Sequence, residues 1–140
     1  MKNIILSIKY KYAKEIINKQ KRYEFRGWIW KDEVKYVYLY SSEKIHKIVA
    51  RFKIKQIINE KPSKIWIKCE DGSGVTKKDF FSYVNMFNYN SVYAIEISEL
   101  EILKPDDYIS LSEVNIMNAP QRFKYLDKDI SKNLGNLFNE

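Results

Sequence analysis

Short segments in which apolar side chains follow one another or alternate with polar ones recur along the chain, and each predicts a β-strand. The clearest is residues 48–55, where every second residue is apolar and the intervening positions include Arg51 and Lys53. This alternation is typical of a strand with one buried face. The predicted strands span residues 3–9, 22–28, 34–40, 48–55 and 91–103.

Apolar residues at helical spacing predict three helices between these strands. The first spans residues 10–19, and Pro62 suits the first turn of the second, whose apolar stripe includes Cys69. The third begins after Thr76, which with Asp79 three residues later resembles a capping box. The resulting order, β-α-β-β-β-α-α-β, predicts an α+β fold in which a strongly bent mixed sheet or small barrel is flanked by helices.

The length and composition favour one domain. The chain has 140 residues, of which 45% are hydrophobic and 15% aromatic, enough to build a core and too many for general disorder. We assign residues 1–126 to a single domain whose last part, about residues 105–126, is an arm wrapped on its surface. Residues 127–140 are polar with scattered apolar pairs, and we expect a tail that frays.

The chain has few residues for metal or disulfide chemistry. Cys69 and His46 are its only cysteine and histidine, which excludes an internal disulfide framework and a zinc site of four Cys/His ligands. We expect no metal and no cofactor. No apolar run is long enough to span a membrane, and the first residues do not resemble a signal peptide. We therefore expect a cytoplasmic protein that does not bind membranes.

Positive charge is concentrated in the first half of the chain. Lys and Arg number 25 against 18 Asp and Glu, for a net charge of +7. Residues 1–70 hold 18 basic and 7 acidic side chains, whereas residues 71–140 hold 7 and 11. A basic region of this kind favours a polyanionic partner, with nucleic acid the first candidate. The alternative is a solvated surface of scattered lysines.

One cluster of charged residues lies where the first helix meets the second strand. Glu24 and Arg26 occupy the same face of the predicted strand, and Lys21 stands at its start. A carboxylate between two cations could hold a phosphate through Lys21 and Arg26 and hydrogen-bond a base or ribose through Glu24. The alternative is an exposed charge cluster of little energetic value.

This segment resembles the ASCH domain family of the PUA-like superfamily, whose signature is G-x-K-x-x-E-x-R. Lys21, Glu24 and Arg26 match it, while Lys19 replaces the glycine, which predicts a different exit from the first helix. The segments I-L-S-I-K-x-K-Y-A, V-K-Y-V-Y-L-Y-S-S, E-D-G-S-G-V-T-K-K-D-F-F and A-P-Q-R-F-K-Y-L are also similar to stand-alone prokaryotic members. Together they cover about residues 3–126.

The resemblance implies a PUA-like barrel that binds RNA or a modified nucleotide in a cleft lined by Lys21, Glu24 and Arg26. It also places Ser41 and Ser42 near this cleft, and favours Arg122 at its rim. Some relatives resemble enzymes, which makes a hydrolase acting on a modified base, such as an acyl-cytidine amidohydrolase, or a ribonuclease the alternative. Glu24 stands where the amidohydrolases have their threonine nucleophile, so that nucleophile is missing here, and an enzyme would use a different chemistry with Lys21 and Glu24 as the acid/base pair. A further alternative is a domain that docks a protein partner.

Two other features have open interpretations. The turn Gly72, Ser73 and Gly74 precedes a helix and could form a secondary anion site from backbone N–H groups, although most such turns are connectors. Trp28 and Trp30 could stack on nucleobases or pack inside the domain. For Tyr36, Tyr38 and Tyr40, which share one strand face, a half-buried sheet face is the favoured interpretation.

Overall fold

The computed structural model describes residues 1–138 as one mixed sheet with helices at both ends. The strands are β1 (Lys2–Ile8), β2 (Tyr23–Arg26), β3 (Val34–Ser41), β4 (Lys47–Glu60), β5 (Val92–Ile102) and β6 (Phe123–Leu126). The helices are α1 (Tyr10–Ile17), α2 (Pro62–Cys69), α3 (Lys77–Met86) and α4 (Lys128–Leu137), with 3₁₀ turns η1 (Pro105–Asp107) and η2 (Leu111–Val114). The α+β class predicted from the sequence is confirmed.

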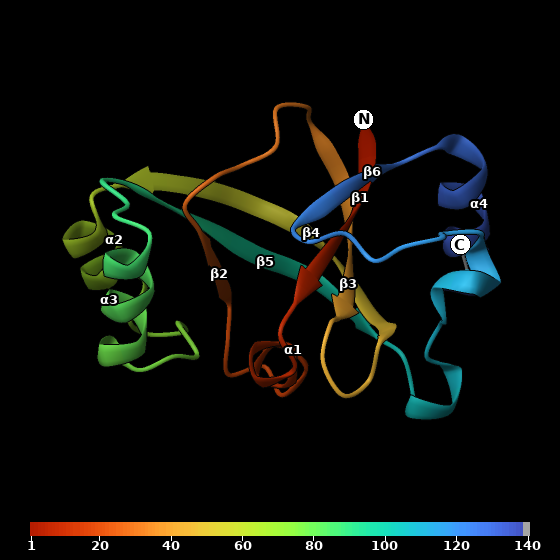
Figure 1. Cartoon of the computed structure of the whole chain (residues 1–140), viewed down its shortest axis with the longest axis horizontal. Helices are drawn as coiled ribbons and strands as arrows, with labels where there is room; N and C mark the ends of the chain where they lie inside the picture. The colour runs from red at the N-terminus through yellow and green to blue at the C-terminus, as the bar shows by residue number, and fades with distance from the viewer. Residues whose placement is uncertain (139–140) are drawn as a thin grey trace.

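The six strands are ordered β2-β5-β4-β3-β1-β6. β1 pairs with β3 in parallel, and the other neighbours are antiparallel. The long strands β4 and β5 run across the molecule and link its two ends (Figure 1). Within the described residues β2 and β6 remain the two edges of the sheet, so the closed barrel is not confirmed and the sheet is an open, bent one.

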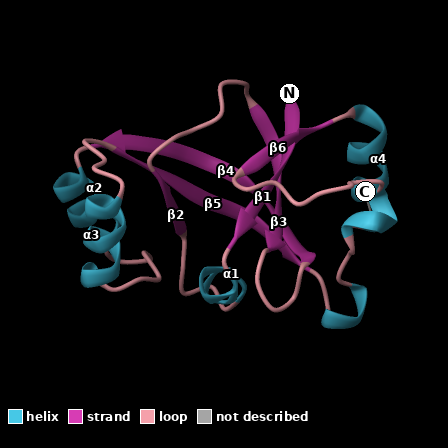
Figure 2. Cartoon of the chain, viewed as in Figure 1, coloured by secondary structure: helices cyan, strands magenta, loops and turns pink. Residues whose placement is uncertain are grey.

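The helices pack at different parts of the sheet. α2 and α3 lie together at one end, α4 and the 3₁₀ turns lie at the other, and α1 lies below the strands between them (Figure 2). The third helix begins as its sequence predicts, because the Thr76 hydroxyl accepts a hydrogen bond of 3.1 Å from the N–H of Asp79. Cys69 is buried with Ile65 and Trp66 against α3, as the apolar stripe of α2 predicts.

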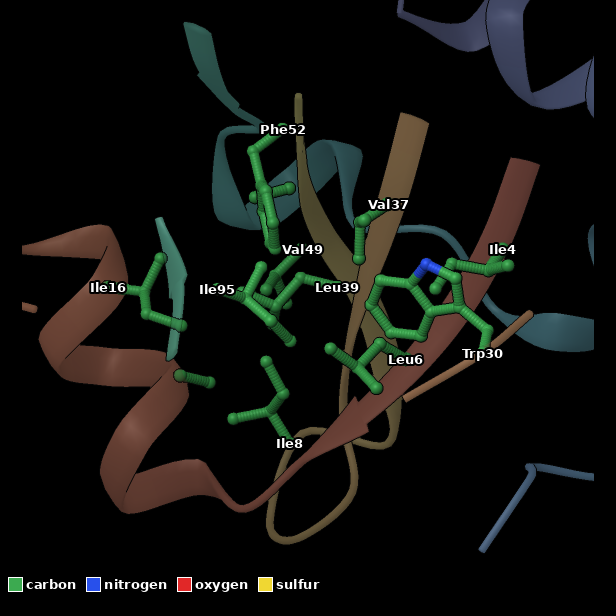
Figure 3. Packing of buried hydrophobic residues seen from close by; sticks show 12 residues of the cluster. Ile4, Leu6, Ile8, Ile16, Trp30, Val37, Leu39, Val49, Phe52 and Ile95 are labelled. Carbon is green, nitrogen blue, oxygen red and sulfur yellow. The ribbon is translucent and has the colours of Figure 1, made fainter. Parts of the chain in front are cut away.

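The central core lies between α1 and the inner face of the sheet. Ile16 of α1 points toward Ile95 of β5, and Leu39 and Leu6 continue the apolar layer toward Trp30 (Figure 3). Trp30 is therefore part of the core, so of the two interpretations left open by the sequence, packing inside the domain is the one that holds. The apolar surface removed from water in this layer holds α1 in place, and α1 in turn determines where β2 begins.

A second core covers the opposite face of β3 and β4. Tyr36, Tyr38 and Tyr40 are at most 9% exposed, because α4 and η2 pack over them. Burial of this sheet face is more complete than the half-buried face that the sequence favours. The first half of β4 is likewise buried on both faces, so Arg51 is only 3% exposed where alternation predicts an exposed residue.

The C-terminal part of the chain is more ordered than its composition suggests. The predicted arm forms η1, η2 and β6, and β6 adds to the sheet as an antiparallel neighbour of β1. The frayed tail expected over residues 127–140 is wrong as far as Phe138: α4 is capped by the Asp127 side chain, and Leu134 and Phe138 are buried. The last two residues of that tail, 139–140, lie outside the described residues. No helix among residues 1–138 has the length and hydropathy to cross a bilayer.

Candidate functional site

A cavity of about 670 Å³ opens beside the edge strand β2. Its walls come from β2, the ends of β1 and α1, one side of α3 and the segment 120–122. The lining includes Lys21, Glu24 and Arg26, so the three charged residues singled out in the sequence meet at one concave surface. This volume is within the range of small-ligand sites in proteins.

The exit from α1 places Lys21 at the start of β2. Lys19 has a φ of 63°, so this lysine adopts the left-handed conformation for which glycine is favoured. The N–H groups of Gln20 and Lys21 then both donate to the Glu15 carbonyl, at 2.9 and 3.0 Å. The different helix exit expected from the missing glycine is therefore wrong, because Lys19 makes the left-handed turn itself.

The ammonium group of Lys21 is held inside the cavity wall. The residue is 3% exposed, its Nζ donates a 2.7 Å hydrogen bond to the Ser73 carbonyl, and it lies 3.8 Å from Oε1 of Glu24. The Nζ also lies 4.7 Å from the centre of the Phe25 ring. Burial lowers the pKa of Lys21 to about 8, and the Glu24 carboxylate opposes this shift.

Glu24 and Arg26 form an ion pair on the face of β2 that alternation predicts. Glu24 is 5% exposed, and its Oε2 accepts hydrogen bonds from Nε of Arg26, at 2.9 Å, and from Nη2. Nη2 also donates to the Ser7 carbonyl, at 3.0 Å, across the open side of the sheet. The interpretation of these charges as an exposed cluster is therefore wrong: the three side chains are buried or nearly so, and they face a cavity.

The turn Gly72, Ser73 and Gly74 positions Lys21 through its backbone carbonyls. The Ser73 N–H donates to the Glu70 carbonyl, and the carbonyls of Gly72 and Ser73 accept hydrogen bonds from the Arg22 N–H and the Lys21 ammonium. A Cβ at Gly74 would lie 2.4 Å from that of Lys21. The turn thus presents acceptors to a cation and is not part of the cavity lining, and the secondary anion site at this turn stays a prediction.

The remaining predicted residues divide between the cavity and the core. Ser42 and Arg122 line the cavity, but Ser41 is not part of its lining and its hydroxyl donates to the Glu43 carbonyl. Trp28 lines the cavity beside two guanidinium groups, with Arg26 at 5.2 Å and Arg122 at 5.1 Å from its ring centre. Trp28 also stacks on Phe123, with ring centres 5.7 Å apart, so it packs in the domain while it lines the cavity, unlike the buried Trp30.

Sequence reasoning missed an aromatic side of the cavity. Tyr83, Phe87 and Tyr89 line it from the end of α3 and the loop that follows. The Tyr83 hydroxyl accepts a 3.3 Å hydrogen bond from the N–H of Gly27, directly after the charged motif. Burial, together with its hydrogen bond to Tyr89, raises the pKa of Tyr83 to about 12. The spacing of Tyr83 and Phe87, four residues apart, was the available signal, but it resembles a core stripe.

Charges around the cavity are predominantly positive. Five cationic side chains line it against two carboxylates, Glu24 and Asp79. Lys11 of α1 and Asp79 of α3 form a 3.1 Å ion pair that joins two walls of the cavity. The hydrogen bond raises the pKa of Lys11 and lowers that of Asp79. Such a lining attracts an anionic ligand. Among the described residues, no cluster of three or more His, Cys, Asp or Glu side chains has the arrangement of a metal site.

Comparisons with known proteins identify the fold. No family model matches the sequence, and the search of curated proteins finds no match. Among solved structures, an ASCH protein from Zymomonas mobilis is 16% identical with a TM-score of 0.86, covering 96% of this chain and 94% of the other. A Tyr-to-Phe mutant of that protein also has a TM-score of 0.86, over 98% and 99% of the two chains, and a Ser-to-Ala mutant has 0.85 over 96% and 95%, both at 16% identity. The chain therefore has the fold of ASCH proteins.

Proposed function

Starting from the ASCH fold, we propose that this chain binds RNA or a nucleotide in the cavity beside β2. The observation that supports the proposal best is the convergence of Lys21, Glu24 and Arg26 on one wall of a 670 Å³ cavity. The cations suit a phosphate, and Glu24 suits a base or ribose donor. Trp28 adds a planar surface beside them. By resemblance, this is an RNA-binding module of the PUA-like type.

The geometry leaves donors for a ligand. Nε and Nη2 of Arg26 are engaged by Glu24 and Ser7, whereas within residues 1–138 its Nη1 donates no hydrogen bond. Glu24 thus orients the guanidinium and leaves one N–H pair for a phosphate. Arg122 at the rim is exposed and can meet a second phosphate without losing burial. Such contacts release counterions, so affinity falls as salt is raised.

Binding of fluorescein-labelled single-stranded RNA, measured by anisotropy over a salt series, tests the proposal. Arg26→Lys keeps the charge but loses the planar donor pair, and we expect at least a tenfold loss of affinity. Arg122→Ala weakens binding less and reduces the slope of log affinity against log salt by about 0.7. Lys64→Ala, an exposed cation on α2 outside the cavity, is the matched control. Unchanged affinity in folded Arg26→Lys and Arg122→Ala would overturn the proposal.

A second candidate function is hydrolysis of a modified nucleobase or cleavage of RNA. The observation that favours it is the buried pair of Lys21 and Glu24, whose charged atoms lie 3.8 Å apart. A lysine with a pKa of about 8 exchanges protons readily near neutral pH, as a general acid or base must. The purified protein is incubated with N4-acetylcytidine and, separately, with single-stranded RNA. Product that disappears in Glu24→Gln supports an enzyme; binding without product supports the first proposal.

A further inference from the structure

A series of aromatic rings leads from β2 to the mouth of the cavity. Tyr89 rests directly on the backbone of Gly27, where an added Cβ would lie 2.1 Å from its ring. Phe87 stacks on Tyr89 with centroids 5.4 Å apart and ring planes inclined by 19°. The centre of the Tyr83 ring lies 5.5 Å from that of Phe87 and 5.4 Å from that of Tyr89. The inner rings are therefore fixed in position by the strand that carries Glu24 and Arg26.

The outermost ring of this series is open to solvent. Phe87 is 51% exposed and lines the cavity, whereas Tyr89 behind it is partly buried. Met86, which precedes Phe87, is 74% exposed and also lines the cavity. A phenylalanine supported from behind and exposed at the mouth of a cation-lined cavity resembles the stacking platforms of single-stranded nucleic-acid binders.

We propose that Phe87 stacks on the base of a nucleotide adjoining the one held by Lys21, Glu24 and Arg26. The ligand is then a single-stranded chain of at least two nucleotides, one inside the cavity and the next on the aromatic mouth. The inference rests on the proposed function of the same cavity and adds to it a subsite and the minimum length of the ligand.

The charges that line the cavity agree with a phosphodiester linking the two positions. Lys9, Lys11 and Arg122 line the cavity together with the aromatic residues. A chain passing from the cavity to Phe87 would have its phosphate in a positive environment, whereas an acyl chain or apolar peptide would gain nothing from these cations. The planar exposed ring and the cations together select a nucleic-acid strand.

The test compares the same protein with ligands of different length. Pools of 5′-mononucleotides, dinucleotides and octanucleotides, each with all four bases at every position, are titrated by calorimetry at fixed ionic strength. We expect the wild type to bind the dinucleotide pool more tightly than the mononucleotide pool. Phe87→Ala should lose about 5- to 150-fold of the affinity for octanucleotides, the range of one lost stack, with little change for mononucleotides.

Three variants separate stacking from other effects. Phe87→Trp should retain the affinity for octanucleotides, and Phe87→Leu, which is apolar but not planar, should lose it. Ile67→Ala removes an apolar side chain that is 79% exposed on α2 and is not part of the cavity lining, so its affinity should not change. Thermal unfolding confirms that each variant is folded, as expected for a half-exposed residue.

The outcomes distinguish the inference from the function beneath it. If the wild type binds all three pools, and Phe87→Ala binds each with unchanged affinity, the subsite is wrong while the proposed function stands. Equal losses in Phe87→Ala for mononucleotides and octanucleotides would also overturn it, by placing Phe87 in the first nucleotide position. Failure of the wild type to bind any pool overturns the proposed function as well.

Discussion

Two arginines with little exposure pair with carboxylates in this molecule, and one of them, Arg26, lines the cavity beside β2. Arg26 pairs with Glu24 on β2 and lines the candidate site. Arg51 pairs with Glu101 through Nε and Nη2, at 2.6 and 3.1 Å, but lies over the Tyr36 ring at 3.9 Å inside the second core.

The surroundings give the two pairs different roles. Arg51 donates further to the Tyr38 hydroxyl at 3.3 Å, and the Phe138 ring lies 5.0 Å from its guanidinium carbon. Its environment is made of protein side chains and holds the C-terminal helix to the sheet. Arg26 instead keeps an N–H pair directed away from its protein partners. Burial of a charge is therefore not enough to indicate a ligand site; access from a cavity is the distinguishing feature.

The largest expected effects come from replacing each arginine and measuring both stability and RNA binding. Arg51→Ala should lower the free energy of unfolding by about 2 to 3 kcal/mol, because it removes the hydrogen bonds of a buried guanidinium while the half-exposed Glu101 stays in contact with water, and should leave RNA affinity unchanged. Arg26→Ala should lower RNA affinity at least tenfold and should also lower the free energy of unfolding, because it leaves the buried Glu24 carboxylate with Lys21 as its remaining partner. Urea unfolding and RNA anisotropy measure the two effects. Weaker RNA binding by folded Arg51→Ala would contradict the division.

The pH dependence of Lys21 separates binding from stability further. As the pH rises, RNA affinity should fall while the contribution of Lys21 to stability should rise. The pKa of Lys21 in the folded protein is about 8, below its ordinary value of 10.5, so the folded state releases this proton first. Affinity for RNA should fall as the pH rises through 8. Between pH 8 and 10.5 the unfolded state binds more protons at Lys21 than the folded state does. The contribution of Lys21 to the free energy of unfolding therefore rises with pH over this interval.

Lys21→Met isolates these two trends. RNA affinity of the variant should be weaker at pH 7 and should lose the decline centred near pH 8. In urea unfolding, the variant should be most stabilised relative to wild type at pH 7, with the difference shrinking by pH 10. A wild-type affinity that stays constant from pH 7 to 9, with a folded protein throughout, would show that the Lys21 ammonium does not contact the ligand.

A smaller effect concerns the turn that holds Lys21. Gly74 has a φ of 66°, and a Cβ there would meet the Cβ of Lys21 at 2.4 Å. Gly74→Ala should therefore destabilise the fold by about 1 to 3 kcal/mol and displace Lys21 from the Ser73 carbonyl. Urea unfolding measures the loss of stability, and RNA anisotropy measures the loss of affinity that displacement of Lys21 should cause. A variant with wild-type stability and affinity would contradict the close packing between this turn and β2.

The smallest expected effect is at the Lys11–Asp79 pair. Asp79→Asn removes a negative charge from the cavity wall and releases Lys11 for an anionic ligand, so RNA affinity should rise about two- to fivefold. Asp71→Asn is the matched control, because Asp71 pairs with Arg22 on the surface outside the cavity lining. Equal gains in both variants would mean that only the net charge of the protein matters.

Much of the site follows from local sequence pattern. Alternation with a period of two places Glu24 and Arg26 on one strand face whatever the sheet topology. The apolar stripe of α2 and the Thr76 cap are equally local, and the structure confirms them. The ordered segments that resemble ASCH proteins add the fold, which the structural comparison confirms where no family model matches.

Long-range packing accounts for the differences. α4 and η2 cover a sheet face that alternation predicts to be exposed at Arg51, and a polar sequence over residues 128–137 forms a helix because it can bury Leu134 there. The aromatic mouth was missed for the same reason. The four-residue spacing of Tyr83 and Phe87 resembles a core stripe, but α3 ends at Met86 and Phe87 lines the cavity.

The hydrogen bond from Arg26 to the Ser7 carbonyl has a consequence for ligand binding. It joins β2 to β1 by a flexible side chain where a backbone ladder would otherwise fasten two strands. Because Nη2 makes this bond and Nη1 is left for a phosphate, a ligand can bind to Arg26 without parting the two strands. A bound ligand would thus contact, through one side chain, two strands that are not neighbours in the sheet.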